Sequence, residues 1–153
     1  MKDLDNFDKG ILRLLQQNNR LTTQELGEKL NLSQSAVQRR ISRLRKEKII
    51  EAEIAIVSSS ALGVGITTVV DVILHEGSSA KIDEFKADMK ACPEVFQCYY
   101  VTGSYDFVLI VQTRDMTHFE QFSKQYLMDN KNLKHFYTHV VMDTTKISYG
   151  FPI

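Results

Sequence analysis

The sequence lacks the features that mark membrane-spanning and secreted chains. Although 43% of its 153 residues are hydrophobic, they never run together for the roughly 18 positions that a transmembrane helix needs. The first ten residues, MKDLDNFDKG, are polar and acidic, so we expect no secretory signal peptide. These absences predict a cytoplasmic protein with no membrane partner.

The sequence also lacks the patterns of common catalytic and metal sites. GxSxG, HExxH and P-loop motifs are absent. Cys92 and Cys98 form no CxxC pair, which favours buried free thiols in a reducing compartment over a disulfide or a metal site. The histidines are scattered over three segments: His75, His118, His135 and His139. We therefore expect no enzyme, no cofactor and no bound metal.

The chain has no net charge, because 19 lysines and arginines balance 19 aspartates and glutamates. The balance hides an asymmetry, since residues 1–60 carry a net charge of +3 and residues 61–153 a net charge of −3. Positive charge concentrates between Lys29 and Lys48, where seven basic residues accompany one acid, Glu47. A basic first part joined to an acidic second part fits a nucleic-acid reader fused to a domain with another task.

Residues 21–50 predict two short helices joined by a tight polar turn, the pattern of a helix-turn-helix. Thr22 is a good N-cap for the first of these helices, and Glu25 completes a capping box. Ser33 caps the next helix, whose apolar residues recur at helical spacing and face inward: Val37, Ile41 and Leu44. A preceding helix is predicted over about residues 5–17, and the three helices share one small core.

The last helix of this motif turns polar and basic side chains outward when its apolar residues face inward. Hydroxyls, amides and cations suit the major groove of DNA, and we predict that Gln38 and Arg39 contact bases while Arg43 and Lys46 contact phosphates. An ordinary solvated face would look similar, but the short turn, the preceding helix and the concentrated charge favour double-stranded DNA as the partner. The predicted DNA-binding residues are Ser33, Gln34, Ser35, Gln38, Arg39, Ser42, Arg43 and Lys46.

From residue 66 onward, strand and helix patterns alternate in the order βαββαβ. Strands are predicted at residues 66–74, 95–101, 107–111 and 133–147, with helices between Ser78 or Ser79 and Cys92 and between Asp115 or Thr117 and Asn130. This order is typical of a ferredoxin-like domain, in which two helices back one sheet. The other face of the sheet stays bare in a single copy, so a homodimer is expected.

The chain is therefore predicted to be an α+β protein of two domains. Residues 1–52 form a three-helix, winged-type helix-turn-helix domain, and residues 66–153 form the ferredoxin-like βαββαβ domain. Residues 53–65 join them as a linking strand, predicted from the alternation over residues 53–57, and a linker rich in serine and glycine.

Four motifs follow one another along most of the chain. Residues 4–12 read LDxxDxxIL, and residues 32–44 read LSxxxVxRRIxRL. Leu62-Gly63 follows in the linker, and residues 103–106 read GxxD in a predicted hairpin turn. These motifs resemble the opening, the recognition helix, the linker and the effector-domain turn of the Lrp/AsnC family, the feast/famine regulators of bacteria and archaea. The resemblance implies a cytoplasmic transcription factor that dimerises through its sheets and assembles further into octamers. It also implies small-molecule effectors, most often amino acids, bound between dimers near that turn.

The chemistry of the turn fits such an effector. Asp106 can pair with an ammonium group, and the backbone N–H groups of Gly103 and Ser104 can bind a carboxylate. Including candidates from the last strand, the predicted effector-binding residues are Gly103, Ser104, Tyr105, Asp106, Thr138 and His139. Three alternatives stay open: a plain hairpin turn, a second domain that only oligomerises, and, more remotely, an enzyme with a catalytic βαββαβ domain.

Overall fold

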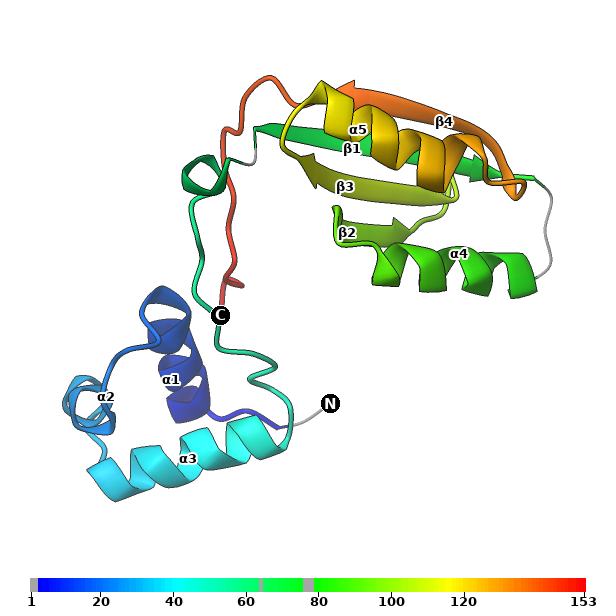
Figure 1. The fold of residues 1–153 in the computed structure, drawn as a ribbon. Coiled ribbons are helices and arrows are strands. Elements are labelled where there is room, and N and C mark those ends of the chain that lie inside the picture. Colours follow the sequence, from blue (N-terminus) through cyan, green and yellow to red (C-terminus); the bar gives the residue numbers. More distant parts are fainter. Residues whose placement is uncertain (1–2, 64, 76–78) are drawn as a thin grey trace. The chain divides into compact units, whose positions relative to one another are not determined.

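The computed structural model describes residues 3–63, 65–75 and 79–153, and the chain divides into two compact units. Unit 1 comprises Met1–Ile56 together with Thr145–Ile153, and unit 2 comprises Val57–Thr144. Unit 1 carries a three-helix helix-turn-helix and unit 2 carries a βαββαβ domain, so the predicted α+β fold is confirmed (Figure 1).

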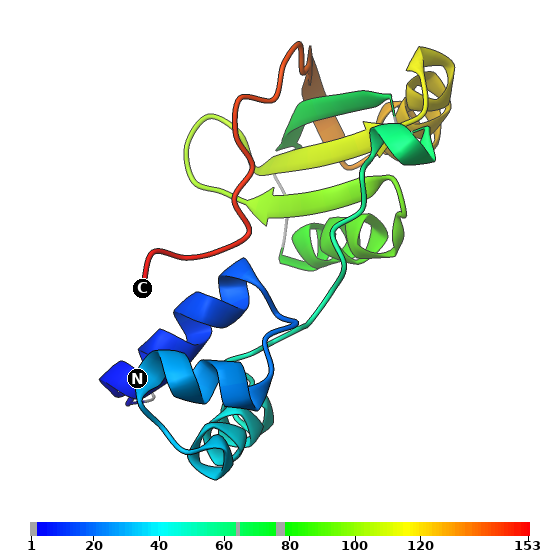
Figure 2. The same ribbon diagram turned by 90° about the vertical axis from the view of Figure 1, so that its left-hand side faces the viewer.

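Unit 1 is built from α1 (Asn6–Gln17), α2 (Thr23–Leu30) and α3 (Gln34–Lys46) (Figures 1 and 2). Both N-caps predicted for the motif are present, because Thr22 Oγ1 accepts from Glu25 N and Ser33 Oγ accepts from Ala36 N, each at 3.2 Å. Each cap satisfies a backbone donor that the first helical turn leaves open. The core of the unit is a small aliphatic cluster of Ile11, Leu26, Val37, Ile41 and Leu44.

The turn between α2 and α3 depends on Gly27, which the motif analysis overlooked. Asn31 ends α2 in the left-handed conformation with φ of 53°, and Leu32 N then donates to Gly27 O at 2.9 Å. A Cβ at position 27 would lie 2.5 Å from Leu32 O, which is backbone and cannot swing aside. Only glycine lets the turn between the two helices pass this close to α2.

Residues 145–153 return to unit 1 after the chain has passed through unit 2. The side-chain amide of Gln16 on α1 holds Phe151 twice, since Phe151 N donates to Gln16 Oε1 at 2.6 Å and Gln16 Nε2 donates to Phe151 O at 3.3 Å. Arg13 Nε also donates to Ile153 O at 2.6 Å. Unit 1 is therefore assembled from two separate pieces of the chain.

Unit 2 is one antiparallel sheet with strand order β2-β3-β1-β4. Its elements are β1 (Ile66–Leu74), α4 (Ser79–Ala91), β2 (Val95–Tyr100), β3 (Phe107–Thr113), α5 (Met116–Ser123), the π-helical continuation η2 (Lys124–Met128) and β4 (Leu133–Val140). Asp115, one of the two candidate caps for α5, is its N-cap. Ser78, one of the two candidate caps for α4, lies outside the described residues. Helices α4 and α5 pack on one face of the sheet over an aromatic core that includes Phe85, Phe107, Phe119 and Phe122 (Figure 1).

One predicted strand is absent and another ends early. Residues 53–57 form no strand, because no segment among the described residues pairs with their backbone and an unpaired strand is not stable in water. Ile54 and Ile56 are accordingly 71% and 62% exposed. Unit 1 thus has no strand among its described residues, which corrects the winged-type and linking-strand predictions; the linker holds only the short 3-10 turn η1 (Ser60–Leu62). The last strand stops at Val140, opposite Thr68, rather than near residue 147. One more bond follows, from Val141 N to Thr67 O at 2.9 Å, and β1 begins one residue further on at Ile66, so most of residues 141–147 have no β1 residue opposite them.

Candidate DNA interface and effector turn

Helix α3 presents the predicted polar surface to solvent. All of the predicted DNA-binding residues are exposed, while the apolar residues of the same helix are buried in the core of unit 1. We call this set the outward face of α3: Ser33, Gln34, Ser35, Gln38, Arg39, Ser42, Arg43 and Lys46. The helix has no acid in its first turn and three cations in its last turn, so its surface can meet DNA phosphates without like-charge repulsion.

The cations of α3 differ in their pairing. Arg39 and Lys46 make no ion pair within the described part of the chain. Arg40 and Arg43 are held by carboxylates of α1 and its cap, and Arg45 Nη2 lies 2.8 Å from Glu53 Oε1. A helical wheel shows direction but not pairing, so the sequence could not separate these classes.

The carboxylates that hold Arg40 and Arg43 come from the start of α1. Asp8 is 1% exposed, and it binds Arg40 Nη1 at 2.9 Å through Oδ1 and Arg43 Nη2 through Oδ2. Asp5 Oδ2 lies 2.7 Å from the same Arg40 atom. The hydrogen bonds that Arg40 donates to Asp5 and Asp8 raise the pKa of Arg40, while the Asp8 backbone N–H and the Arg40 guanidinium lower the pKa of Asp5. The two aspartates and the two arginines therefore neutralise one another's charges where α1 contacts α3.

The turn that leads into β3 uses Asp106 as a structural acceptor. Asp106 Oδ2 accepts the backbone N–H of Leu74 at 2.8 Å, where the pairing of β1 with β4 shifts register. Asp106 N donates to Val72 O at 2.8 Å, so the residue fastens the turn to β1 at two points. Gly103 has φ of 124°, a conformation that favours glycine. A plain hairpin turn therefore explains why residue 103 is glycine and what one carboxylate oxygen of Asp106 binds.

The other predicted effector residues lie on two sides of the sheet. The Tyr105 ring contacts the Tyr137 ring at a centroid distance of 6.0 Å, which places the tip of the turn over the side of the sheet that α4 and α5 leave open. Thr138 and His139 are both exposed, but adjacent residues of a strand point to opposite faces. His139 shares the open face with Tyr137 and pairs with Asp71 Oδ2 at 3.1 Å, whereas Thr138 points to the helix side.

The open face of the sheet carries apolar and aromatic side chains. Residues of β1 and β3 alternate between a buried set toward the helices and a half-buried set toward the open face. Tyr99 and Tyr137 on the outer strands are 50% and 51% exposed. The apolar and aromatic residues of this face are Val69, Ile73, Tyr99, Val108, Ile110 and Tyr137.

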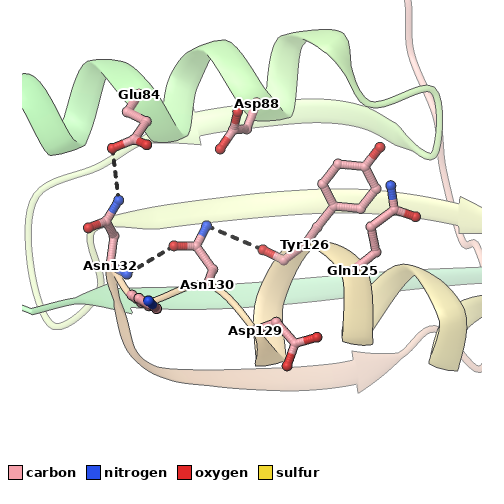
Figure 3. A pocket seen from close by; sticks show the side chains of 8 residues that line it. Glu84, Asp88, Gln125, Tyr126, Asp129, Asn130 and Asn132 are labelled. Carbon is pink, nitrogen blue, oxygen red and sulfur yellow. Dashed lines mark hydrogen bonds between the residues drawn. The ribbon is translucent and has the colours of Figure 1, made fainter.

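A cavity on the helix side escaped the motif analysis. It measures about 410 Å³ and is lined by Glu84, Asp88, Gln125, Tyr126, Asp129, Asn130, Lys131 and Asn132. Figure 3 shows its polar groups bonded to one another, with Asn132 Nδ2 donating to Glu84 Oε2 at 3.0 Å and Asn130 Nδ2 donating to Tyr126 O at 3.5 Å. No sequence signal pointed here, because the lining comes from α4 and from the segment after α5.

Cys92 and Cys98 are free thiols; Cys92 is buried, as predicted, whereas Cys98, also predicted to be buried, is half-buried. Cys92 Sγ donates to Glu94 Oε2 at 3.2 Å, and His118 Nε2 lies 3.1 Å from Glu94 Oε1. Burial and the Glu94 carboxylate raise the pKa of the Cys92 thiol, which keeps it protonated at neutral pH. Among the described residues, no three His, Cys, Asp or Glu side chains gather in a metal-binding arrangement. No helix in the same residues has the length and apolarity needed to cross a membrane.

Two family models match the chain at its two units. A model of the AsnC-type helix-turn-helix domain matches residues 4–45, which hold most of α1 to α3, and a model of the Lrp/AsnC ligand-binding domain matches residues 67–151. The chain belongs to the Lrp/AsnC family. The resemblance inferred from the motifs is confirmed, and Lrp/AsnC members are DNA-binding transcriptional regulators with a ligand-binding domain rather than enzymes.

Lrp/AsnC proteins similar to this chain match it over nearly its whole length. An uncharacterised transcriptional regulator of Sinorhizobium fredii is 42% identical over 99% of this chain and 89% of its own. The leucine-responsive regulatory protein of Escherichia coli is 26% identical over 96% of this chain and 90% of its own. A Neisseria meningitidis regulator, solved as a complex with L-methionine, superposes with a TM-score of 0.92 at 29% identity, covering 98% of this chain and 97% of that one.

Proposed function

We propose that this Lrp/AsnC regulator recognises its operator with the outward face of α3. The observation that carries the proposal is the exposure of the whole predicted set, which includes two cations, Arg39 and Lys46, that have no ion pair among the described residues. Gln38 and Arg39 lie in the first half of the helix and contact bases, while Lys46 contacts phosphate at its end. Arg43 lies on the same face, where a phosphate has to share its guanidinium with Asp8.

The test compares two substitutions on an operator selected from random DNA with the wild-type protein. Arg39→Ala is expected to weaken the selected site by about 1–3 kcal/mol and to relax preference at one base pair. Lys46→Ala is expected to weaken all DNA alike and to reduce the salt slope by about one. An Arg39→Ala protein with an unchanged footprint and unchanged specificity would remove this face from base recognition.

We propose further that unit 2 senses an amino acid near Gly103–Asp106. The matched ligand-binding model spans this turn, and the similar Neisseria protein was solved with L-methionine. Asp106 Oδ1 has no hydrogen bond within the described residues, so it is the oxygen that would meet the ammonium group, while Oδ2 stays on Leu74. His139 and Tyr105 reach the same open side of the sheet, and Thr138 contributes only from the helix side.

The effector proposal is tested by calorimetry against a panel of amino acids, followed by DNA titrations with any ligand found. Asp106→Asn keeps an oxygen for Leu74 N–H and removes the charge, so it is expected to fold and to lose most of the response. Asp106→Asn with a wild-type response would exclude Asp106 as the ammonium partner. A wild type that ignores every amino acid would favour a domain that only oligomerises.

We also propose that the protein works in the cytoplasm as a homodimer joined through the open sheet face, with dimers assembling into an octamer. The half-buried apolar residues of that face support the dimer, because contiguous apolar surface is normally covered. Light scattering of the full chain is expected to show at least a dimer, and Ile110→Lys on the open face is expected to give monomers. Met116→Lys, a matched change at an exposed residue of α5, is expected to leave the assembly intact. An assembly that survives Ile110→Lys would exclude this face.

A further inference from the structure

Asp8 binds Arg43, one of the cations on the outward face of α3. It is separated from Arg43 by 35 residues of sequence, yet its buried carboxylate binds the guanidinium of Arg43 on one oxygen and that of Arg40 on the other. The capping box of α1 fixes this carboxylate, since Asp5 N donates to Asp8 Oδ2 at 3.2 Å and Asp8 N donates to Asp5 Oδ1 at 2.8 Å. Asp8 therefore has little freedom to release either arginine.

We propose that Asp8 is a specificity-determining residue, because it withholds the charge of Arg43 from the DNA phosphates. The proposal rests on the DNA-contacting role of the outward face of α3. Arg43 is 42% exposed, so the side chain is accessible to DNA while its charge is balanced by a carboxylate that is 1% exposed. A phosphate that took Arg43 would leave part of a buried negative charge without its partner.

The consequence for recognition follows from the difference between phosphate and base contacts. Phosphate contacts strengthen binding to every sequence alike, whereas base contacts distinguish one sequence from another. An unpaired Arg43 would strengthen non-cognate binding and dilute the discrimination supplied by Gln38 and Arg39. Asp8 thus keeps the cation on the helix while lowering its sequence-independent contribution.

The first experiment measures binding of the full chain to random-sequence duplex DNA and to a selected operator at several salt concentrations. Asp8→Asn is expected to strengthen random-sequence binding several-fold, to steepen its salt slope by about one, and to lower the ratio of specific to non-specific affinity. The matched control is Asp3→Asn, which removes one exposed carboxylate from the same unit and is expected to leave the slope unchanged. If Asp8 served only to hold α1 against α3, Asp8→Asn would lower the stability of unit 1 and leave the salt slope unchanged.

The second experiment needs no change at Asp8, so it decides the matter even if Asp8→Asn fails to fold. Arg43→Gln keeps a donor for Asp8 and removes the charge, and Lys46→Gln makes the same change in charge at an unpaired cation. Lys46→Gln is expected to reduce the salt slope by about one, whereas Arg43→Gln is expected to reduce it by much less, because any phosphate has to share Arg43 with Asp8. In the Asp8→Asn background, Arg43→Gln is expected to restore the wild-type slope.

The two proposals fail in distinguishable ways. Equal slope reductions in Arg43→Gln and Lys46→Gln would show that Arg43 binds phosphate despite Asp8, which overturns the role of Asp8 and keeps the DNA face. If Lys46→Gln has the same salt slope as the wild type, the proposal that the outward face of α3 contacts DNA is wrong, and the role proposed for Asp8 fails with it. A steeper slope in Asp8→Asn that persists after Arg43→Gln would show that the effect does not pass through Arg43.

Discussion

The two units hold their side chains in place by different means. Unit 1 has a small aliphatic core, and its helices are fixed by capping boxes, a close backbone approach at Gly27 and the buried Asp8 cluster. Unit 2 has a larger core, in which the Phe85 ring of α4 contacts the Phe107 ring of β3 and two phenylalanine rings contact each other within α5. The DNA-contacting unit therefore depends on specific polar and steric contacts, while the ligand-binding unit depends on buried apolar area.

The largest effect that can separate the units is expected from Phe107. Its side chain is fully buried and its ring lies 4.7 Å from that of Phe85, so Phe107→Ala is expected to destabilise unit 2 by about 3–5 kcal/mol. Hydrogen exchange measured by mass spectrometry would report the loss segment by segment. Phe96→Ala, at a residue 58% exposed in β2, is the control with little expected effect. Equal loss of protection in α1 to α3 would show that the units unfold together.

The next effect tests the steric contact that closes the helix-turn-helix. Gly27→Ala forces a Cβ against Leu32 O, and it is expected to destabilise unit 1 by about 1–3 kcal/mol and to weaken DNA binding. Gly10→Ala is the matched control, because its Cβ would meet Leu30 Cδ2 at 2.8 Å, the movable end of a side chain. Thermal melts of both variants would settle the comparison, and a Gly27→Ala protein as stable as Gly10→Ala would show that the turn can relax.

A smaller effect concerns the polar contact of unit 2 that most resembles those of unit 1. Asp106→Ala leaves Leu74 N–H without its acceptor, and it is expected to destabilise unit 2 by about 1–3 kcal/mol. Asp106→Asn retains an acceptor and is expected to lose less. Amide exchange at Leu74, followed by NMR, measures the contact directly; similar exchange in the wild type and Asp106→Ala would contradict the assignment.

The smallest effect is the acid sensitivity of the helix caps in unit 1. The Thr22 backbone N–H and hydroxyl lower the pKa of Glu25 from its ordinary 4.5 in the folded chain, and the Asp8 N–H and Arg40 lower that of Asp5. Because the folded-state pKa values are depressed, this stability is present above the ordinary values and is lost as the pH falls through the folded values. The melting temperature of unit 1 is therefore expected to fall below a pH of about 4.

The control for the acid prediction lies in the same helix. Glu25→Gln is expected to flatten the pH dependence, since it removes the titrating capping group. Glu28→Gln, at a carboxylate that accepts from Gln24 rather than capping the helix, is expected to leave it steep. Equal pH profiles for the two variants would remove the capping box as the cause.

Local features of the fold could be predicted from the sequence, and features that depend on a partner could not. Thr22 and Ser33 cap helices because of residues three positions away, a range that pattern rules cover. The strand predicted at residues 53–57 failed because alternation says nothing about whether a second strand is available. The end of β4 was missed for the same reason, since it is set by where β1 begins.

The candidate sites divide in the same way. The outward direction of α3 followed from helical periodicity, and it is confirmed by the exposure of each residue. The pairing of Arg43 with Asp8 was not predicted, because it joins residues from two helices whose contact the sequence does not reveal. Asp106 was chosen for its charge, and its use by Leu74 became visible only with β1 beside the turn.

The return of residues 145–153 to α1 would matter in any exchange of the DNA-binding unit between this chain and a relative. A recombination point after Ile56 would transfer α1 to α3 from one relative to another and leave behind the segment that Gln16 and Arg13 bind. The recipient would then present its own tail to a foreign helix, and the fit would depend on the residues at those two positions. A chimera that keeps this contact needs two junctions, one before Val57 and one after Thr144.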